Sequence, residues 1–144
     1  MKVIEKIENE NKKSEIFRDE KHKQLYSEIC SRMNYLDCYH RSFAYLLSLD
    51  TVLREHIKDA YDFQEHCIKL EVLNKGFQTG TSLKTTRLAF NLWNGWSSDG
   101  KTYTDEDGYE SELPSSYYTP EQIFNCAEYA PYYWQAIKIR FEID

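Results

Sequence analysis

The sequence lacks any long apolar run, and no stretch approaches the roughly 18 residues that a membrane-spanning helix requires. The first residues, Met1–Lys13, are also too polar to form the apolar core of a signal peptide. We therefore expect a cytoplasmic protein with no membrane contact. In that compartment its four cysteines stay reduced thiols, since disulfides form mainly in exported proteins.

A surplus of basic charge is also missing. The 144 residues carry 18 Lys and Arg against 24 Asp and Glu, which gives a net charge of −6. Direct nucleic-acid binding requires a basic surface, so this balance argues against it. It does not argue against a partner protein that itself binds nucleic acid.

Motifs for metal and nucleotide chemistry are absent as well. No two of the cysteines and histidines show the CxxC or HxxxH spacing of a zinc site, so we predict no metal ligands. The segment Gly76–Gly80 is not a phosphate-binding P-loop, because three residues rather than four separate its glycines and no lysine directly follows Gly80. We expect no cofactor.

What the sequence does contain is helical periodicity. After a polar lead-in of residues 1–15, residues 16–144 indicate one compact, mostly α-helical domain of about five to six helices. Residues 62–75 fit a short strand or another helical turn. Residues 97–118 form an acidic insert, either a long loop or a weak hairpin around Asp107-Gly108. We expect helices from Asp19 through Met33, Asp37 to Ser48, Thr51 to Ala60 behind an Asp50 cap, Thr81 or Ser82 to Gly95, after Thr119-Pro120, and Pro131 to Arg140.

The helix that ends at Gly95 has a polar face. Its members are three or four residues apart and therefore line one side: Lys84, Arg87, Asn91 and Asn94. Hydroxyl and amide groups stand at the helix start, where free backbone N–H groups attract anions: Gln78, Thr79, Thr81 and Ser82. These residues predict a site for a phosphate, a carboxylate or an acidic side chain of a partner. The alternative is a well-capped helix whose polar side is only solvated.

A second candidate site is the acidic block of residues 99–112, which contains six acids and one lysine. Acids interleaved with tyrosine can imitate a phosphate backbone and contact a basic surface on a partner. A solvated loop is the alternative. The candidate contact residues are Asp105, Glu106, Asp107, Tyr109 and Glu110.

The segment Asp37–Arg41 is a third candidate. His40 is of the residue type that most often serves as a general base, and Asp37, one helical turn away, could orient it. The alternative is that Asp37 caps a helix and His40 packs structurally. Because no set of nucleophile, base and orienting group is visible, we predict no catalytic residues.

Several short motifs lie along the chain: Tyr39-His40-Arg41, Asp62-Phe63, Gln78–Ser82, Thr85–Gly95, Tyr129–Trp134, Ala136–Lys138 and Arg140. Together they resemble a small bacterial family of unknown function, met in Gram-positive gut anaerobes, their phages and their mobile elements. The resemblance covers residues 16–142. It implies that the segments Gln78–Gly95 and Tyr129–Trp134 are the family's signature and could meet in one site. The polar lead-in and the longer acidic insert depart from the family.

Two functions are compatible with these features. The first is a non-enzymatic interaction protein of a phage or mobile element that binds and modulates a host protein. A nucleic-acid-binding target, or inhibition of a bacterial defence system such as CRISPR, fits this function, although the phage setting comes only from the resemblance. The second is an enzyme or ligand-binding domain with a phosphate or nucleotide site at Thr79–Arg87, near secondary candidates His40, Arg41, Tyr129 and Tyr132. We expect the first.

Overall fold

The structure of the protein is a computed structural model that describes residues 15–144. Except for Glu15, the expected polar lead-in lies outside this part. The described chain has six α-helices, which confirms the predicted mostly α-helical fold. None of the helices in residues 15–144 is both long enough and apolar enough to cross a membrane. The helices are α2 (Glu20–Arg32), α3 (Cys38–Leu49), α4 (Ile57–Ala60), α5 (Gly80–Asn94), α6 (Pro120–Ile123) and α7 (Ala130–Phe141).

Two small antiparallel sheets and three 3-10 turns complete the described fold. Residues 62–75, for which two interpretations stayed open, contain both a short strand and a helical turn. The sheets pair β1 (Tyr61–Asp62) with β2 (Cys67–Ile68), and β3 (Ser98–Thr104) with β4 (Glu110–Pro114). The turns are η1 (Leu53–Glu55), η2 (Leu70–Asn74) and η3 (Ser116–Tyr118).

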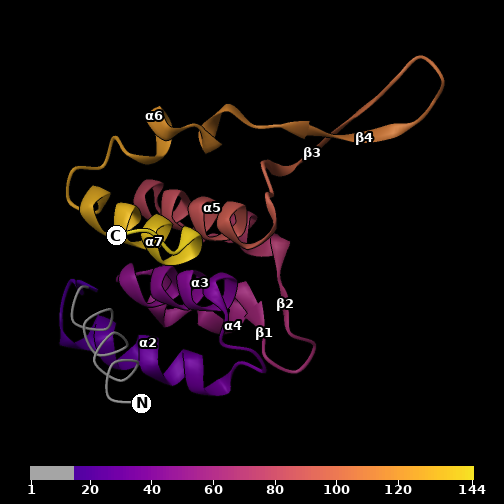
Figure 1. Cartoon of the computed structure of the whole chain (residues 1–144). Helices are drawn as coiled ribbons and strands as arrows, with labels where there is room; N and C mark the ends of the chain where they lie inside the picture. The colour runs from indigo at the N-terminus through magenta and orange to yellow at the C-terminus, as the bar shows by residue number, and fades with distance from the viewer. Residues whose placement is uncertain (1–14) are drawn as a thin grey trace.

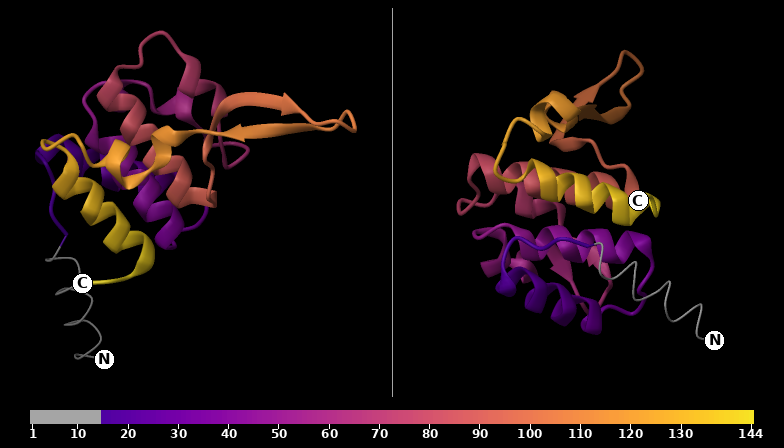
Figure 2. Two further views of the ribbon diagram at one scale, coloured as in Figure 1. Left: turned by 90° about the horizontal axis from the view of Figure 1, so that it is seen from above. Right: turned by 60° about the vertical axis from the view of Figure 1, so that its left-hand side comes forward.

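Helix α3 lies at the centre of the helical body. In Figure 1, α2 packs below it, and α5 and α7 lie above it (Figures 1 and 2). Nine of its twelve residues are buried, and Phe43, Tyr45 and Leu46 among them are fully enclosed. A helix that is apolar around most of its circumference must be covered on several sides. The layered arrangement follows from that requirement.

The helix ends follow the predicted capping residues. Asp19 and Asp37 cap α2 and α3 by accepting a hydrogen bond from the backbone N–H three residues on, at 2.6 and 2.9 Å. Thr119 caps α6 in the same way at 3.4 Å. Gly95 ends α5 at a φ of 80°, a left-handed conformation that glycine adopts without a steric cost.

The predicted helix of residues 51–60 is wrong in part, because it is broken in two. Asp50 caps its start as predicted, and its Oδ1 accepts the backbone N–H groups of Val52 and Leu53 at 2.9 Å each, but the first turn is the 3-10 turn η1. The chain leaves helical geometry at His56, whose ring stacks on Phe77 with centroids 3.6 Å apart. The stacking partner lies in another segment, so periodicity within residues 51–60 could not reveal the break.

A neutral histidine lies in the core between α2 and α3. His22 is fully buried, its Nε2 donates to the Tyr45 carbonyl at 2.8 Å, and its Nδ1 accepts the Arg18 backbone N–H at 3.1 Å. These two bonds fix the tautomer that carries its proton on Nε2. Burial, together with the nearby charges of Arg54 and Arg18, lowers the pKa of His22 to about 4.

We predict that His22 makes the protein less stable as the pH falls from 6.5 towards 4. In this window the unfolded chain takes up a proton on His22 and the native state does not, so protonation favours unfolding by up to about 3 kcal/mol. The variant His22→Gln lacks this titration. Urea denaturation should show a free energy of unfolding that falls with pH more steeply in the wild type than in the variant. Parallel pH profiles would contradict the prediction.

Candidate functional site

The predicted acidic insert contains a β-hairpin, which we call the acidic hairpin (residues 98–114). β3 and β4 pair in antiparallel register, with Tyr103 opposite Ser111 and Thr104 opposite Glu110. Of the two predictions for this insert, a long loop or a hairpin, the hairpin is therefore confirmed. The two strands project from the helical body, and the tip stands clear of the helices in each view (Figures 1 and 2).

Asp105 holds the tip of the hairpin in shape. Its Oδ1 accepts the backbone N–H groups of Asp107 at 3.0 Å and Tyr109 at 2.9 Å, and its own N–H donates to the Tyr109 carbonyl at 2.9 Å. Gly108 has a φ of 83°, which residues with a Cβ rarely adopt. Asp105 is thus required for the turn, whereas the side chains of Glu106 and Asp107 have no partner within residues 15–144.

One face of the acidic hairpin carries its exposed apolar side chains. Side chains alternate along a strand and share a face with their cross-strand partners, so Tyr103 lies on the same side as Ser111, Tyr109 and Leu113. Tyr103, Tyr109 and Leu113 are 49%, 71% and 46% exposed. No part of the described chain therefore encloses this apolar face.

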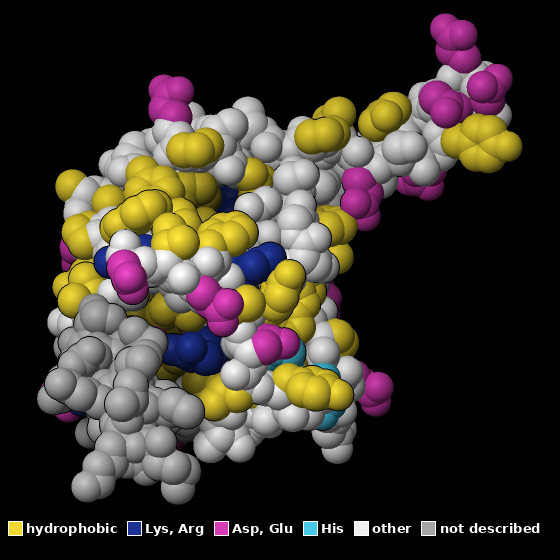
Figure 3. All heavy atoms as spheres, in the orientation of Figure 1, with side chains coloured by type: hydrophobic (Ala, Val, Ile, Leu, Met, Phe, Trp, Pro, Cys, Tyr) yellow, Lys and Arg dark blue, Asp and Glu magenta, His cyan; other side chains and the backbone are white. Residues whose placement is uncertain are grey.

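The opposite face is polar and acidic. It carries the cross-strand pairs Thr102–Glu112 and Thr104–Glu110, and Thr102 Oγ1 donates to Glu110 Oε1 at 2.6 Å. Figure 3 shows the acidic side chains gathered at the far end of the hairpin, beside an exposed hydrophobic ring. The acids and the apolar side chains therefore occupy one projecting element.

Arg87 of α5 anchors the root of the hairpin. Its Nε and Nη2 donate to the two carboxylate oxygens of Asp99 at 3.0 and 3.2 Å, and the two side chains are 13% and 20% exposed. Ser115 Oγ donates to the same carboxylate at 3.0 Å, and the guanidinium lies 4.6 Å from the centre of the Tyr117 ring. One of the two cations of the predicted anion site is thus bound by an acid of the predicted acidic block. The two candidate sites share one ion pair.

The polar groups at the start of α5 bind one another. The helix begins at Gly80, just before the expected start, because Thr79 Oγ1 accepts the Ser82 N–H at 3.1 Å and Ser82 Oγ accepts the Thr79 N–H at 2.7 Å. Ser82 Oγ also lies 2.6 Å from Gln78 Oε1, and Gln78 Nε2 donates to Thr86 Oγ1 at 3.2 Å. Ser82 and Thr86 are fully buried, so these groups close a network inside the protein.

The rest of the predicted polar face is divided between local bonds and solvent. Asn91 Nδ2 donates to the Trp96 carbonyl at 3.1 Å, and Asn94 Oδ1 accepts the Trp96 N–H at 3.1 Å, so both residues hold the end of α5. Thr81 is half-buried, and its backbone carbonyl accepts the Thr85 hydroxyl at 3.1 Å. The side chain of Lys84 has no partner within residues 15–144. Anion binding here stays a prediction.

His40 lies apart from this face. Its Nδ1 is 2.6 Å from Asp37 Oδ1, and its ring packs against Trp93 with centroids 4.7 Å apart. Burial acts to raise the pKa of Asp37, but the hydrogen bonds from the His40 ring and backbone N–H lower it overall. Asp37 caps α3, which is the structural role that the sequence left as the alternative.

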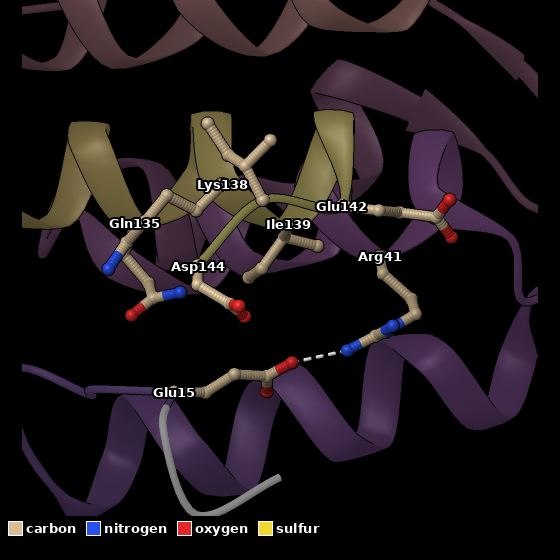
Figure 4. A pocket seen from close by; sticks show the side chains of 8 residues that line it. Glu15, Arg41, Gln135, Lys138, Ile139, Glu142 and Asp144 are labelled. Atoms are coloured by element: carbon tan, nitrogen blue, oxygen red, sulfur yellow. Dashed lines mark hydrogen bonds and ion pairs between the residues drawn. The ribbon is translucent and has the colours of Figure 1, made fainter. Parts of the chain in front are cut away.

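Arg41 lines a cavity of about 310 Å³ between α3 and the C-terminal half of α7 (Figure 4). It pairs with Glu15, and its Nε donates to the Tyr26 hydroxyl at 3.3 Å. The lining carries charges of both signs and includes neither Thr81 nor Arg87. Its other members are Gln135, Lys138, Ile139, Glu142, Ile143 and Asp144.

The two segments that the resemblance singles out, Gln78–Gly95 and Tyr129–Trp134, meet in the core. Thr85 Oγ1 of α5 lies 2.7 Å from the hydroxyl of Tyr133 in α7, and both residues are fully buried. Tyr129 is buried beneath Arg18, whose guanidinium lies 5.0 Å from the ring centre, and Tyr132 packs against the core. The two segments therefore meet through a buried hydrogen bond. Within residues 15–144 no three His, Cys, Asp or Glu side chains come together as metal ligands.

Comparison with known proteins places the chain in a family. Residues 12–144 match the model of a family of unknown function, DUF6075. The chain belongs to this family. No curated protein and no solved structure matches the chain. The DUF6075 match includes helices α2 to α7 and the whole acidic hairpin, so the candidate site lies within the family domain.

The exposed apolar side chains of the acidic hairpin were not all predicted from the sequence. Tyr103 and Leu113 were not among the predicted contact residues, although both are about half exposed, at 49% and 46%. A signal was present, since Tyr109, Ser111 and Leu113 alternate with acids, and a period of two is typical of a strand with two different faces.

We predict that Arg87→Ala lowers the free energy of unfolding by about 2 kcal/mol, because it leaves the largely buried Asp99 carboxylate without its counter-charge. Lys84→Ala is the matched control on the same helix, and it should change stability by less than about 0.5 kcal/mol. Urea denaturation measures both changes. An Arg87→Ala variant of unchanged stability that no longer binds phosphate would instead favour the anion site.

Proposed function

We propose that this DUF6075 protein is a non-enzymatic interaction protein whose acidic hairpin docks on a partner protein. The observation that carries the proposal is the uncovered apolar face formed by Tyr103, Tyr109 and Leu113. Antiparallel sheets usually pack one face on a core, and a two-stranded sheet by itself is only marginally stable in water. A partner surface would supply the cover that this face lacks within the described chain.

The acids around this face favour a partner with a basic groove. Glu106 and Asp107 stand at the tip, and Glu110 and Glu112 line the opposite face. Opposite charges across an interface speed association and select the partner. Proteins that bind nucleic acid present basic grooves of this kind. We therefore propose a host protein of this class as the target, effectors of bacterial defence among them, with the hairpin blocking its groove.

The root of the hairpin supports this role because it fixes the direction in which the hairpin leaves the body. Arg87 and Ser115 both hold the Asp99 carboxylate, and the Tyr118 hydroxyl donates to the Ser98 carbonyl at 3.0 Å. An element that is ordered before binding loses less conformational entropy when it binds. The hairpin can therefore bind a partner without first becoming ordered.

An anion site at the start of α5 has less support as the working surface. Arg87 is bound to Asp99, and Ser82 and Gln78 bond to each other at 2.6 Å. A ligand at this position would have to displace these internal bonds. The side chains of Glu106 and Asp107 require no such displacement.

We predict that the double variant Glu106→Lys with Asp107→Lys weakens partner binding about tenfold or more, because it reverses the charge that meets the basic groove. Glu65→Lys with Glu71→Lys is the matched control, since it changes net charge equally at two exposed acids outside the hairpin. Both double variants should melt as the wild type does. Asp105 is left unchanged because it holds the turn.

The measurement is capture of host proteins on the immobilised wild type and on both double variants, followed by affinity measurement with the purified partner. A protein retained by the wild type and the control, and lost with the tip variant, supports the proposal. Equal retention by all three would show that the hairpin is not the docking element.

A further inference from the structure

The outer face of α7 is apolar and exposed. Tyr133, Ala136 and Ile139 of this helix are buried, yet Trp134 and Phe141, two turns apart, are 48% and 55% exposed. Figure 3 shows hydrophobic side chains gathered where α7 faces the viewer in Figure 1. Exposed large apolar side chains that gather on one surface are typical of an interaction site. This face of α7 lacks a cover within residues 15–144.

At the C-terminal end of this face, Arg140 is held in a fixed orientation. Its guanidinium lies 3.6 Å from the centre of the Tyr39 ring and 4.7 Å from that of Phe141. Its Nε donates to the Leu92 carbonyl at 2.8 Å, at the end of α5. Tyr39 is 41% exposed and Phe141 is 55% exposed. We call Tyr39, Arg140 and Phe141 the arginine platform.

The arginine platform has hydrogen-bond donors, the Nη groups of Arg140, that have no acceptor within residues 15–144. Arg140 has no acidic partner within residues 15–144, and its Nη groups make no hydrogen bond there, whereas four other arginines pair with acids: Arg18, Arg41, Arg54 and Arg87. A guanidinium in a fixed plane can bind a carboxylate at two points. Arginine and aromatic side chains also dominate the energetics of protein interfaces. The platform therefore fits an acidic segment that carries an apolar side chain.

The acidic hairpin has the matching chemistry. Tyr109 is 71% exposed on its apolar face, and the neighbouring side chains of Glu106 and Asp107 have no partner within residues 15–144. The hairpin does not meet the platform of its own chain, because it projects from the helical body with its tip clear of α7 (Figures 1 and 2). A second copy of the chain can bring the two surfaces together.

We infer that the acidic hairpin of one molecule docks on the arginine platform of a second copy. Tyr109 packs against Tyr39 and Phe141, and a tip carboxylate binds Arg140. This inference rests on the proposed function, since the same hairpin is the docking element. Self-association then covers the hairpin until a partner with a more basic surface displaces the second copy.

The contact should be weak, because Glu142 adjoins the platform and each molecule carries a net charge of −6. We expect a dissociation constant of about 10 to 100 μM for the wild type. Such an affinity permits displacement by a partner that offers several cations.

Sedimentation velocity of the full-length chain, from about 1 to 300 μM, tests the inference. The wild type should sediment faster as its concentration rises. Tyr109→Ser on the hairpin and Phe141→Ser on the platform should each lower the association constant about tenfold, because each removes a ring from the contact. Glu65→Lys with Glu71→Lys, which belong to neither surface, should not weaken association.

A charge swap tests the pairing directly. Arg140→Glu and the tip variant Glu106→Lys with Asp107→Lys should each associate about tenfold more weakly than the wild type. Their equimolar mixture should regain association, because the tip lysines of one meet the glutamate of the other. Arg140 also bonds to Leu92, so the melting temperature of Arg140→Glu is measured first. If that variant does not fold, Phe141→Glu takes its place.

A wild type that stays monomeric to about 300 μM would overturn the inference. Self-association that Tyr109→Ser and Phe141→Ser leave unchanged would overturn it as well. Neither result bears on the proposed function, which partner capture decides. If the wild type and the tip variant capture the same proteins equally, the proposed function is wrong. The sedimentation result would still decide whether the chain self-associates.

Discussion

Helix α3 is apolar around most of its circumference, and this property constrains the rest of the fold. Its fully buried side chains, Phe43 and Leu46 among them, require cover on several sides, which α2, α5 and α7 supply. The buried polar groups then need partners inside the same layers. His22 bonds to the Tyr45 carbonyl, and Thr85 of α5 bonds to the Tyr133 hydroxyl of α7. A single enclosed helix thus sets the position of three others.

The acidic hairpin is linked to this core through one ion pair. Arg87 extends from α5, whose opposite side packs on α3, and binds Asp99 at the root of β3. The buried body therefore determines where the hairpin leaves the molecule, while the hairpin itself adds little to the core. The helical body holds the buried core, the hairpin carries the proposed docking surface, and Arg87 links the two.

The polar groups of the described chain are of two kinds. Some bond to one another inside the protein, and others have no partner of opposite charge. Residues of the α5 start, such as Ser82 and Gln78, satisfy one another, as is usual for buried polar groups. By contrast, Glu106, Asp107 and Arg140 have no partner of opposite charge within residues 15–144. Groups of this second kind can bind another molecule without giving up an internal bond. That difference is why the hairpin and the arginine platform, rather than the α5 start, carry the proposals.

The sequence by itself determined the helical class, most helix ends and the position of the acidic turn, because these depend on local periodicity, on caps such as Asp37 and on the glycines Gly95 and Gly108. Only the tertiary structure decided the partners of the charged residues. Arg87 pairs with Asp99 twelve residues away, and Arg140 meets Tyr39 of a different helix. Such pairs arise when separate elements pack together, and no spacing along the chain encodes them.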